Sequence, residues 1–238
     1  MDSHLTALPR IEAGGHGRLR PVVPGLWATP PETLGGPVNT CGFLIQRAEG
    51  NAFVYSYSSI EAHYDHIDEL GGVAMVLLNH RDEAGSHVTA LADRYSATVH
   101  AHAEEIESCR QRGVGAITPL AGDIELGSDL EAWHTPGHTP GVTSYCWRNP
   151  NDGLRYLFTG DSFNQATFDR VTAIFTFHPY EGNAGDLRQT LVRLRDANSD
   201  VLVPGLDWGD VDAYRWSTEE RHALFDHLIT QLDATNPQ

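Results

Sequence analysis

The chain of 238 residues contains no lysine: all 16 of its basic side chains are arginines, against 32 acidic side chains. The resulting formal net charge of −16 argues against a nucleic-acid partner, because binding to a phosphate backbone needs clustered cations. Long hydrophobic runs are also lacking, since no stretch reaches the roughly 18 apolar residues of a membrane-spanning helix. We therefore expect neither nucleic acid nor a membrane as a partner.

Cysteine is scarce as well. Cys41, Cys109 and Cys146 lie far apart, and no CxxC pair is present. This spacing argues against a disulfide framework and predicts buried thiols in a reducing compartment. The first residues carry no basic stretch followed by an apolar core, so they do not resemble a signal peptide. These features together predict a cytoplasmic protein.

What is present is an ordinary globular composition, with 40% hydrophobic and 20% charged residues. A chain of this length can bury a large core. Residues 1–20 are rich in Gly, Arg and His and show little periodicity, so we expect a loosely held N-terminal arm there. Residues 21–238 contain no linker, low-complexity run or tandem repeat, which predicts one domain.

Strand-like and helical patterns alternate along this domain. Apolar runs at 22–29, 38–46, 52–57 and 73–79 predict strands, and the last of these has the continuous apolar character of a strand buried on both faces. Helices are expected at 59–70, 83–95, 186–197 and 218–232. Because helices follow strands in both halves and both halves also contain antiparallel-looking meanders, the sequence predicts an α/β (α+β) fold with mixed β-sheets covered by helices.

Three residues that can bind a metal ion each follow a predicted strand. His80 comes directly after the apolar run 73–79, His138 lies in the loop HTPGHTPG at 134–141, and Asp161 ends the strand YLFTGD at 156–161. Strand ends form a rigid platform on which side chains from distant parts of the chain converge. Imidazole and carboxylate ligands together suit Zn, Fe or Mn.

The HTPGHTPG loop, followed by the Asp of FTGD and preceded by a strand–His–helix element, resembles the metallo-β-lactamase superfamily. The resemblance runs from about residue 22 to residue 209. It implies a four-layer αββα sandwich of two mixed β-sheets with a metal site at one edge. The family includes thioesterases such as hydroxyacylglutathione hydrolases, lactonases, β-lactamases, nucleases and a persulfide dioxygenase branch.

The chain departs from the family's HxHxDH motif, which here reads His-Arg-Asp-Glu-Ala-Gly at 80–85. Asp82 replaces the second His, while Ala84 and Gly85 replace the Asp and His that usually hold a second metal. A later Pro-Gly-His motif reads Pro-Gly-Leu and ends at Leu206. Since Ala and Leu offer no lone pair, we expect one divalent metal or none, with zinc as the first choice and iron as the alternative. The predicted ligands are His80, Asp82, His138 and Asp161.

Two residues next to His80 in the sequence each have two interpretations. Asp82 and Glu83 are candidates for catalytic roles, but Asp82 is also suited to cap a helix at 83–95 and Glu83 to place a charge in its first turn. Other residues are expected to line the pocket or to support a ligand from behind: His87, His134, Asp207, Trp208 and His178.

The leading functional hypothesis is a metal-dependent hydrolase that uses a metal-activated water on an ester, thioester or lactone of a small molecule. An alternative is a mononuclear non-haem iron dioxygenase of the persulfide dioxygenase type, because His80, His138 and Asp161 supply two His and one carboxylate. A second alternative is a catalytically inactive binding protein, given the lost ligand positions. Aromatic residues that suit a homodimer interface are Phe175, Phe177 and Tyr180.

Overall fold

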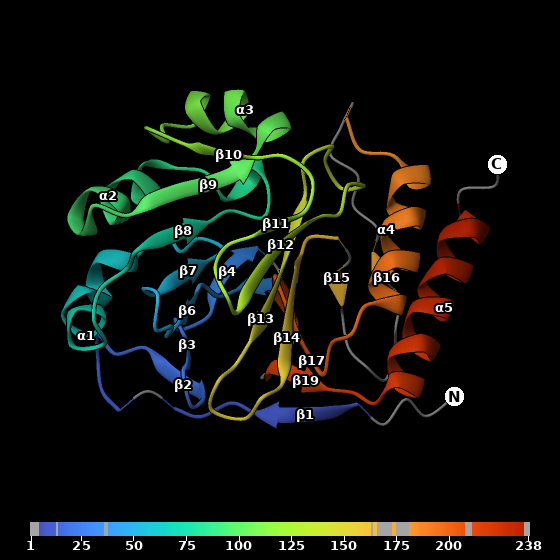
Figure 1. Ribbon diagram of the computed structural model, residues 1–238, viewed down its shortest axis with the longest axis horizontal. Helices are drawn as coiled ribbons and strands as arrows, with labels where there is room; N and C mark the ends of the chain where they lie inside the picture. The colour runs from blue at the N-terminus through green and yellow to red at the C-terminus, as the bar shows by residue number, and fades with distance from the viewer. Residues whose placement is uncertain are drawn as a thin grey trace.

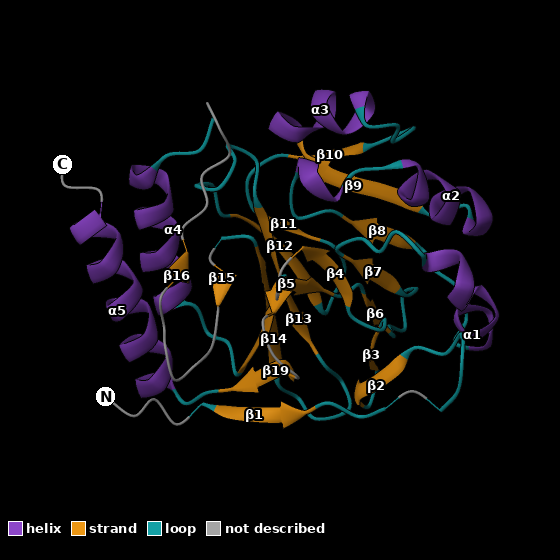
Figure 2. Cartoon of the chain, turned by 180° about the vertical axis from the view of Figure 1, so that it is seen from behind, coloured by secondary structure: helices purple, strands orange, loops and turns teal. Residues whose placement is uncertain are grey.

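Two large β-sheets pack face to face in the computed structural model (Figure 1). The structure describes residues 5–12, 14–35, 38–162, 164–165, 173–174, 181–207 and 211–235. Helices cover the outer face of each sheet, so the order of layers is helix, sheet, sheet, helix (Figure 2). The mixed strand directions and this layering confirm the predicted αββα sandwich.

The C-terminal sheet contains strands from both ends of the chain. Its strand order among the described residues is β1 (Thr6–Pro9), β19 (Val211–Arg215), β17 (Val201–Pro204), β14 (Arg155–Gly160), β13 (Thr143–Arg148), β12 (Leu130–His134) and β11 (Ile124–Glu125). Only β14 and β17 pair in parallel in this sheet, within the described part of the chain.

The N-terminal sheet has the described strand order β10 (Thr118–Leu120), β9 (Thr98–His102), β8 (Met75–Leu77), β7 (Ala52–Val54), β6 (Phe43–Ile45), β3 (Leu26–Ala28) and β2 (Arg20–Val23). Strands β7 to β10 run parallel to one another, and the rest are antiparallel. A smaller sheet contains β16 (Ala173–Ile174), β15 (Asn164–Gln165), β18 (Leu206–Asp207), β5 (Val38–Thr40) and β4 (Glu32–Gly35).

The helices bury apolar side chains against the sheets, and α5 packs against α4. The helices are α1 (Tyr64–Glu69), α2 (Ser86–Tyr95), α3 (Ile106–Gln111), α4 (Ala184–Asp196) and α5 (Thr218–Thr235), with short 3₁₀ turns η1 (Ile60–His63), η2 (Arg81–Glu83) and η3 (Ala103–Glu105). Helix α2 buries Val88, Leu91 and Ala92, the face that the sequence indicates. None of the described helices combines the length and apolar character needed to cross a membrane.

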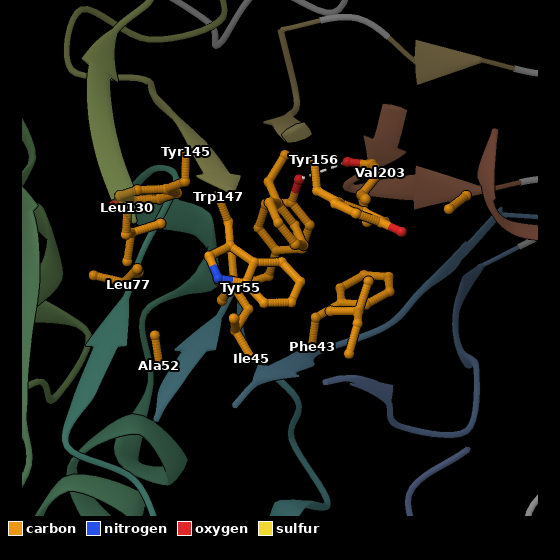
Figure 3. Packing of buried hydrophobic residues seen from close by; sticks show 14 of the residues in the cluster. Phe43, Ile45, Ala52, Tyr55, Leu77, Leu130, Tyr145, Trp147, Tyr156 and Val203 are labelled. Atoms are coloured by element: carbon orange, nitrogen blue, oxygen red, sulfur yellow. Dashed lines mark hydrogen bonds between the residues drawn. The ribbon is translucent and has the colours of Figure 1, made fainter. Parts of the chain in front are cut away.

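Aromatic side chains fill the space between the two large sheets (Figure 3). Phe43 and Tyr55 come from the N-terminal sheet side and Phe158 from the C-terminal sheet, and their three rings contact one another edge to face. The Tyr55 hydroxyl, buried in this cluster, donates a hydrogen bond to the Val203 carbonyl at 3.0 Å. This contact crosses from one sheet to the other close to the strand ends that carry the predicted ligands.

The N-terminal segment corrects the expectation of a loosely held arm over residues 1–20. Residues 6–9 form β1, which pairs antiparallel with β19 at the edge of the C-terminal sheet (Figure 1). Arg20 begins β2, and its guanidinium forms a buried ion pair with Asp212, 2.6 Å away. The sequence pattern missed these contacts because both partners lie about 200 residues away along the chain, beyond the reach of local periodicity.

Loss of one partner of the buried Arg20–Asp212 pair should destabilise the fold far more than loss of one partner of an exposed pair nearby. Both side chains are almost inaccessible, at 4% and 2% exposure, so Asp212→Ala leaves an uncompensated buried cation. We expect a loss of about 3–5 kcal/mol in the free energy of unfolding, measured by urea denaturation. Glu69→Ala, which removes the exposed partner of Arg18, is the control and should change little. Equal effects of the two variants would contradict this assignment.

Candidate metal centre

The predicted ligands come together where the two large sheets meet at one edge. His80 follows β8 of the N-terminal sheet, whereas His138 lies between β12 and β13 and Asp161 follows β14. The backbone joins these elements, because the Thr143 N–H at the start of β13 donates to the Asn79 carbonyl at 2.9 Å. The Tyr145 hydroxyl of β13 also donates to the Leu78 carbonyl at 2.7 Å. The end of β8 is thereby held against the start of β13.

Four potential ligand atoms face one another at this edge. The Nε2 atom of His80 lies 3.6 Å from Asp82 Oδ2 and 3.7 Å from Asp161 Oδ2, and His138 Nε2 lies 3.9 Å from Asp82 Oδ2. The ligand atoms of His80, Asp82 and His138 all lie within 4.8 Å of one another. Atoms that all bind the same ion at about 2.0–2.2 Å must lie a few ångströms from one another, as these atoms do.

The donor set fits a divalent cation. His80 is 2% exposed, and its Nε2 atom has no hydrogen-bond partner among the described residues. A buried imidazole nitrogen in this state costs free energy unless a ligand satisfies it. Two imidazoles with two carboxylates form a set that zinc, iron and manganese accept. The residues present therefore fit a single metal ion.

Asp82 is oriented by contacts on both of its oxygens. Contact with the imidazoles of His138 and His80 holds the pKa of Asp82 well below its ordinary value, and the charge of Arg112 adds to this effect. The Arg112 guanidinium lies 2.7 Å from Oδ1, so Oδ2 is left facing the two His rings. The alternative of a helix cap is not observed, since α2 begins at Ser86 with Gly85 at the capping position.

Glu83 lies next to His80 and is not among the ligand atoms that face one another. This position differs from the expected catalytic role of Glu83. Its Oε2 accepts a hydrogen bond from the Asn79 N–H at 2.7 Å, and its Oε1 lies 3.9 Å from Nδ1 of His80, on the opposite side of the ring from Nε2. Burial raises the pKa of Glu83 well above its ordinary value. The structure therefore places this carboxyl next to His80 as a supporting group.

One position that holds a second metal in the resemblance, residue 85, lies against a neighbouring side chain. A Cβ atom on Gly85 would lie 2.6 Å from Cε1 of His87, so the His87 ring occupies the space into which a side chain at residue 85 would extend. His87 lines a small hollow with Tyr55, Tyr57 and Leu91. Burial lowers the pKa of His87, which favours its neutral form. Ala84 and Leu206 carry no ligand atoms.

His134 supports the loop that carries His138. Its Nε2 donates to the Pro140 carbonyl at 2.8 Å, which joins the two ends of the loop. Its ring stacks on His102, with centroids 4.1 Å apart and planes within 6° of parallel. The other predicted pocket residues are not placed by the structure. His178 and Trp208 lie outside the described residues, as does the side chain of Asp207. The aromatic residues predicted for a homodimer interface, Phe175, Phe177 and Tyr180, also lie outside the described residues.

Glu105 is a supporting residue that sequence reasoning missed. Its side chain is fully buried and joins two ligand-bearing segments. One oxygen accepts from the Thr139 hydroxyl at 2.9 Å and the Gly141 N–H at 2.8 Å, beside His138. The other accepts from the Arg81 N–H at 3.1 Å and Nε at 2.5 Å, beside His80. In the sequence, nothing distinguishes Glu105 from Glu104 or Glu107 on the same helical segment.

Removal of the Glu105 charge should destabilise the fold in a pH-dependent way. Burial opposes ionisation of Glu105, but hydrogen bonds from Arg81 and Thr139 outweigh it and lower the pKa below 4.5. A lowered folded-state pKa stabilises the fold above about pH 4.5, and this contribution is lost as the pH falls through the folded-state pKa. We expect Glu105→Gln to cost about 3–5 kcal/mol at neutral pH, in urea denaturation.

The difference between wild type and Glu105→Gln should shrink as the pH falls below about 4.5, because the carboxyl group of the unfolded chain is protonated first, and it should vanish only below the lowered folded-state pKa, where the native carboxylate is protonated as well. Glu104→Gln, at an exposed neighbouring position, is the matched control and should behave as wild type. A difference that stays constant over the acidic range would show that the charge of Glu105 is not the stabilising feature.

Comparisons with known proteins agree with this geometry. Residues 62–206, which include all four predicted ligands, match the family model described as the metallo-beta-lactamase superfamily. A search of curated proteins gives no significant match.

Solved structures share the fold at low identity. TMB-1 superposes with a TM-score of 0.69 at 15% identity, over 93% of this chain and 99% of its own. A metallo-β-lactamase from Pontibacter korlensis gives 0.65 at 14%, over 91% and 98%. A metallo-β-lactamase family protein from Thermus thermophilus gives 0.64 at 19%, over 90% and 82%. The family model, which covers more than half of the sequence, shows that this chain belongs to the metallo-β-lactamase superfamily.

Proposed function

We propose that the protein is a metal-dependent hydrolase that cleaves an ester, thioester or lactone of a small molecule. The observation that carries this proposal is the convergence of His80, Asp82 and His138, with Asp161 beside them, at the edge of a superfamily fold. The residues are far apart in the sequence and meet with their nitrogen and oxygen ligand atoms toward one another. The fold itself is that of metal-dependent hydrolases.

One divalent ion, with zinc as the first choice, would be held by His80, Asp82, His138 and Asp161. Such an ion supplies a Lewis acid that activates water and polarises a carbonyl group. Two ionised carboxylates balance the charge of one divalent cation, while the two imidazoles contribute neutral nitrogen ligands. The structure offers no ligand atoms at Ala84, Gly85 and Leu206, which supports a single ion.

The protein's own residues divide the site into a buried side and an open side. His80 and His138 are buried and keep their rings in place. Asp82 is 40% exposed on its side chain and lies against the similarly exposed Arg112. We therefore expect a small molecule to reach the ligand atoms from the side of Asp82 and Arg112, where the guanidinium would offer hydrogen-bond donors to an oxyanion or a carbonyl.

A mononuclear iron dioxygenase is the second candidate. The observation in its favour is that His80 Nε2 lies only 3.7 Å from Asp161 Oδ2, with His138 close by, which is a set of two His and one carboxylate. Asp82 counts against it, because a fourth protein ligand takes one of the positions that O₂ and substrate need. Iron in the purified protein and O₂ uptake with a persulfide would favour this candidate.

Metal content and hydrolysis should depend together on His138. We expect the purified protein to contain about one divalent metal per chain by elemental analysis, and to hydrolyse at least one member of a thioester, lactone and ester panel. His138→Ala should lose the metal and lower the rate by more than about a hundredfold, since even partners behind a ligand contribute 10–100-fold.

His227→Ala, at an exposed position on α5, is the matched control and should keep both the metal and the activity. A wild-type protein with stoichiometric metal but no hydrolysis above the His138→Ala background would reject the proposed hydrolase. A protein without metal under all loading conditions would favour the third interpretation, a catalytically inactive binding protein.

A further inference from the structure

Asn79 is a buried residue with hydrogen bonds to segments of both sheets, and the hydrolase proposal assigns it no role. It is 0% exposed and directly precedes His80. Its side-chain Nδ2 donates to the Thr143 carbonyl at 2.5 Å, and its Oδ1 accepts from the Asp161 N–H at 3.0 Å. Its backbone N–H donates to Glu83 and its backbone carbonyl accepts from Thr143. One side chain thus contacts the segments that carry His80 and Asp161 and the strand that follows the His138 loop.

The partners of the Asn79 amide determine which way it faces. A backbone carbonyl such as that of Thr143 only accepts, so the amide nitrogen must face it. A backbone N–H such as that of Asp161 only donates, so the amide oxygen must face that group. These two partners therefore determine which amide atom is the oxygen and which is the nitrogen, and they exclude the flipped assignment.

This orientation has a consequence for His80. The Asn79 Oδ1 atom lies 3.1 Å from Nδ1 of His80, within hydrogen-bond distance. Because the amide oxygen can only accept, the His80 Nδ1 atom must carry the proton in this contact. In a neutral ring the lone pair then lies on Nε2, the buried atom that has no hydrogen-bond partner among the described residues. Glu83 Oε1, at 3.9 Å from Nδ1, is too distant to replace this bond.

We propose that Asn79 is a positioning residue that holds His80 with its proton on Nδ1 and aligns the Asp161 turn through the same amide oxygen. This proposal rests on the metal site proposed above, and it concerns how that site is prepared before an ion binds. Second partners of metal-ligating His residues act in this way, by setting the protonated nitrogen and the ring orientation. Here one acceptor atom serves two of the predicted ligand residues.

The chain leaves room for this arrangement at Gly160. A Cβ atom at this position would overlap the Asn79 side chain, and the backbone there has a φ of +53°, which favours glycine. The Gly160 N–H donates to the Tyr55 hydroxyl at 2.9 Å, and that hydroxyl donates in turn to the Val203 carbonyl (Figure 3). The turn that presents Asp161 is therefore held by Asn79 at the Asp161 N–H and by Tyr55 at the Gly160 N–H.

The protonated nitrogen of His80 is directly measurable in the metal-free wild-type protein. We expect nitrogen NMR on protein with isotopically labelled histidine to show a proton on Nδ1 of His80, assigned by comparison with His80→Gln. A neutral His80 ring with its proton on Nε2 would overturn the proposal. This result does not depend on activity, so a failure of the hydrolase proposal leaves it intact.

A variant pair tests whether Asn79 is responsible. Asn79→Ala should weaken the binding of Zn²⁺, measured by competition with a chromogenic chelator, by about 10–100-fold. It should also release the preference of His80 for a proton on Nδ1. Asn149→Ala is the matched control, because Asn149 is equally buried and hydrogen-bonded but lies in the turn beyond the other end of β13.

Both variants lose a buried hydrogen-bonded side chain, so a general loss of stability should affect them alike. Unchanged Zn²⁺ affinity in Asn79→Ala, or equal weakening in both variants, would overturn the role of Asn79. If Asn79→Ala does not fold, the wild-type spectrum still tests the proposal, since a proton on Nε2 would contradict an amide oxygen that accepts from Nδ1 at 3.1 Å and would overturn it.

Discussion

The hydrogen bonds between Asn79 and Thr143 hold the end of a strand in one sheet against the start of a strand in the other. His80 is the next residue along the chain, and the loop with His138 leads directly into Thr143. The separation of the two imidazoles, 4.8 Å between ring centroids, therefore follows from backbone contacts at a fully buried position. The Tyr145 hydroxyl on the Leu78 carbonyl and Glu105 between Arg81 and the His138 loop strengthen the same link between the two sheets.

Buried ion pairs reinforce the same edge, and the absence of lysine suits them. Arg81 uses its Nε and Nη2 atoms on the two oxygens of Glu105, a planar two-point contact that an ammonium group does not provide. Glu105 in turn holds the His138 loop through Thr139 and Gly141. Because separation of the pair would leave an uncompensated charge in the interior, movement of these two loops away from each other is strongly unfavourable.

The departures from the family's motif form a consistent set in the structure. Asp82 turns one oxygen toward both imidazoles, so it occupies the place of a missing ligand. Gly85 leaves space that the His87 ring takes, and Ala84 and Leu206 offer no ligand atoms. At the candidate site the carboxylate of Asp82 lies where the motif has an imidazole, and the donors that remain suit one ion. A more anionic ligand set of this kind favours harder cations than a set of three imidazoles does.

By itself, the sequence predicted mixed sheets covered by helices, the apolar face of α2 and the candidate ligands, because strand and helix periods are local and His80, His138 and Asp161 each end or follow a strand. The four-layer order was implied by the resemblance of the HTPGHTPG and FTGD motifs to the metallo-β-lactamase superfamily. Only the tertiary structure decided that Thr6 pairs with Arg215, that Glu83 faces the back of His80 and that Glu105 joins two loops. The reason is physical: a local pattern states which side of an element is buried, whereas the partner of a buried polar group is set by contacts between residues far apart along the chain.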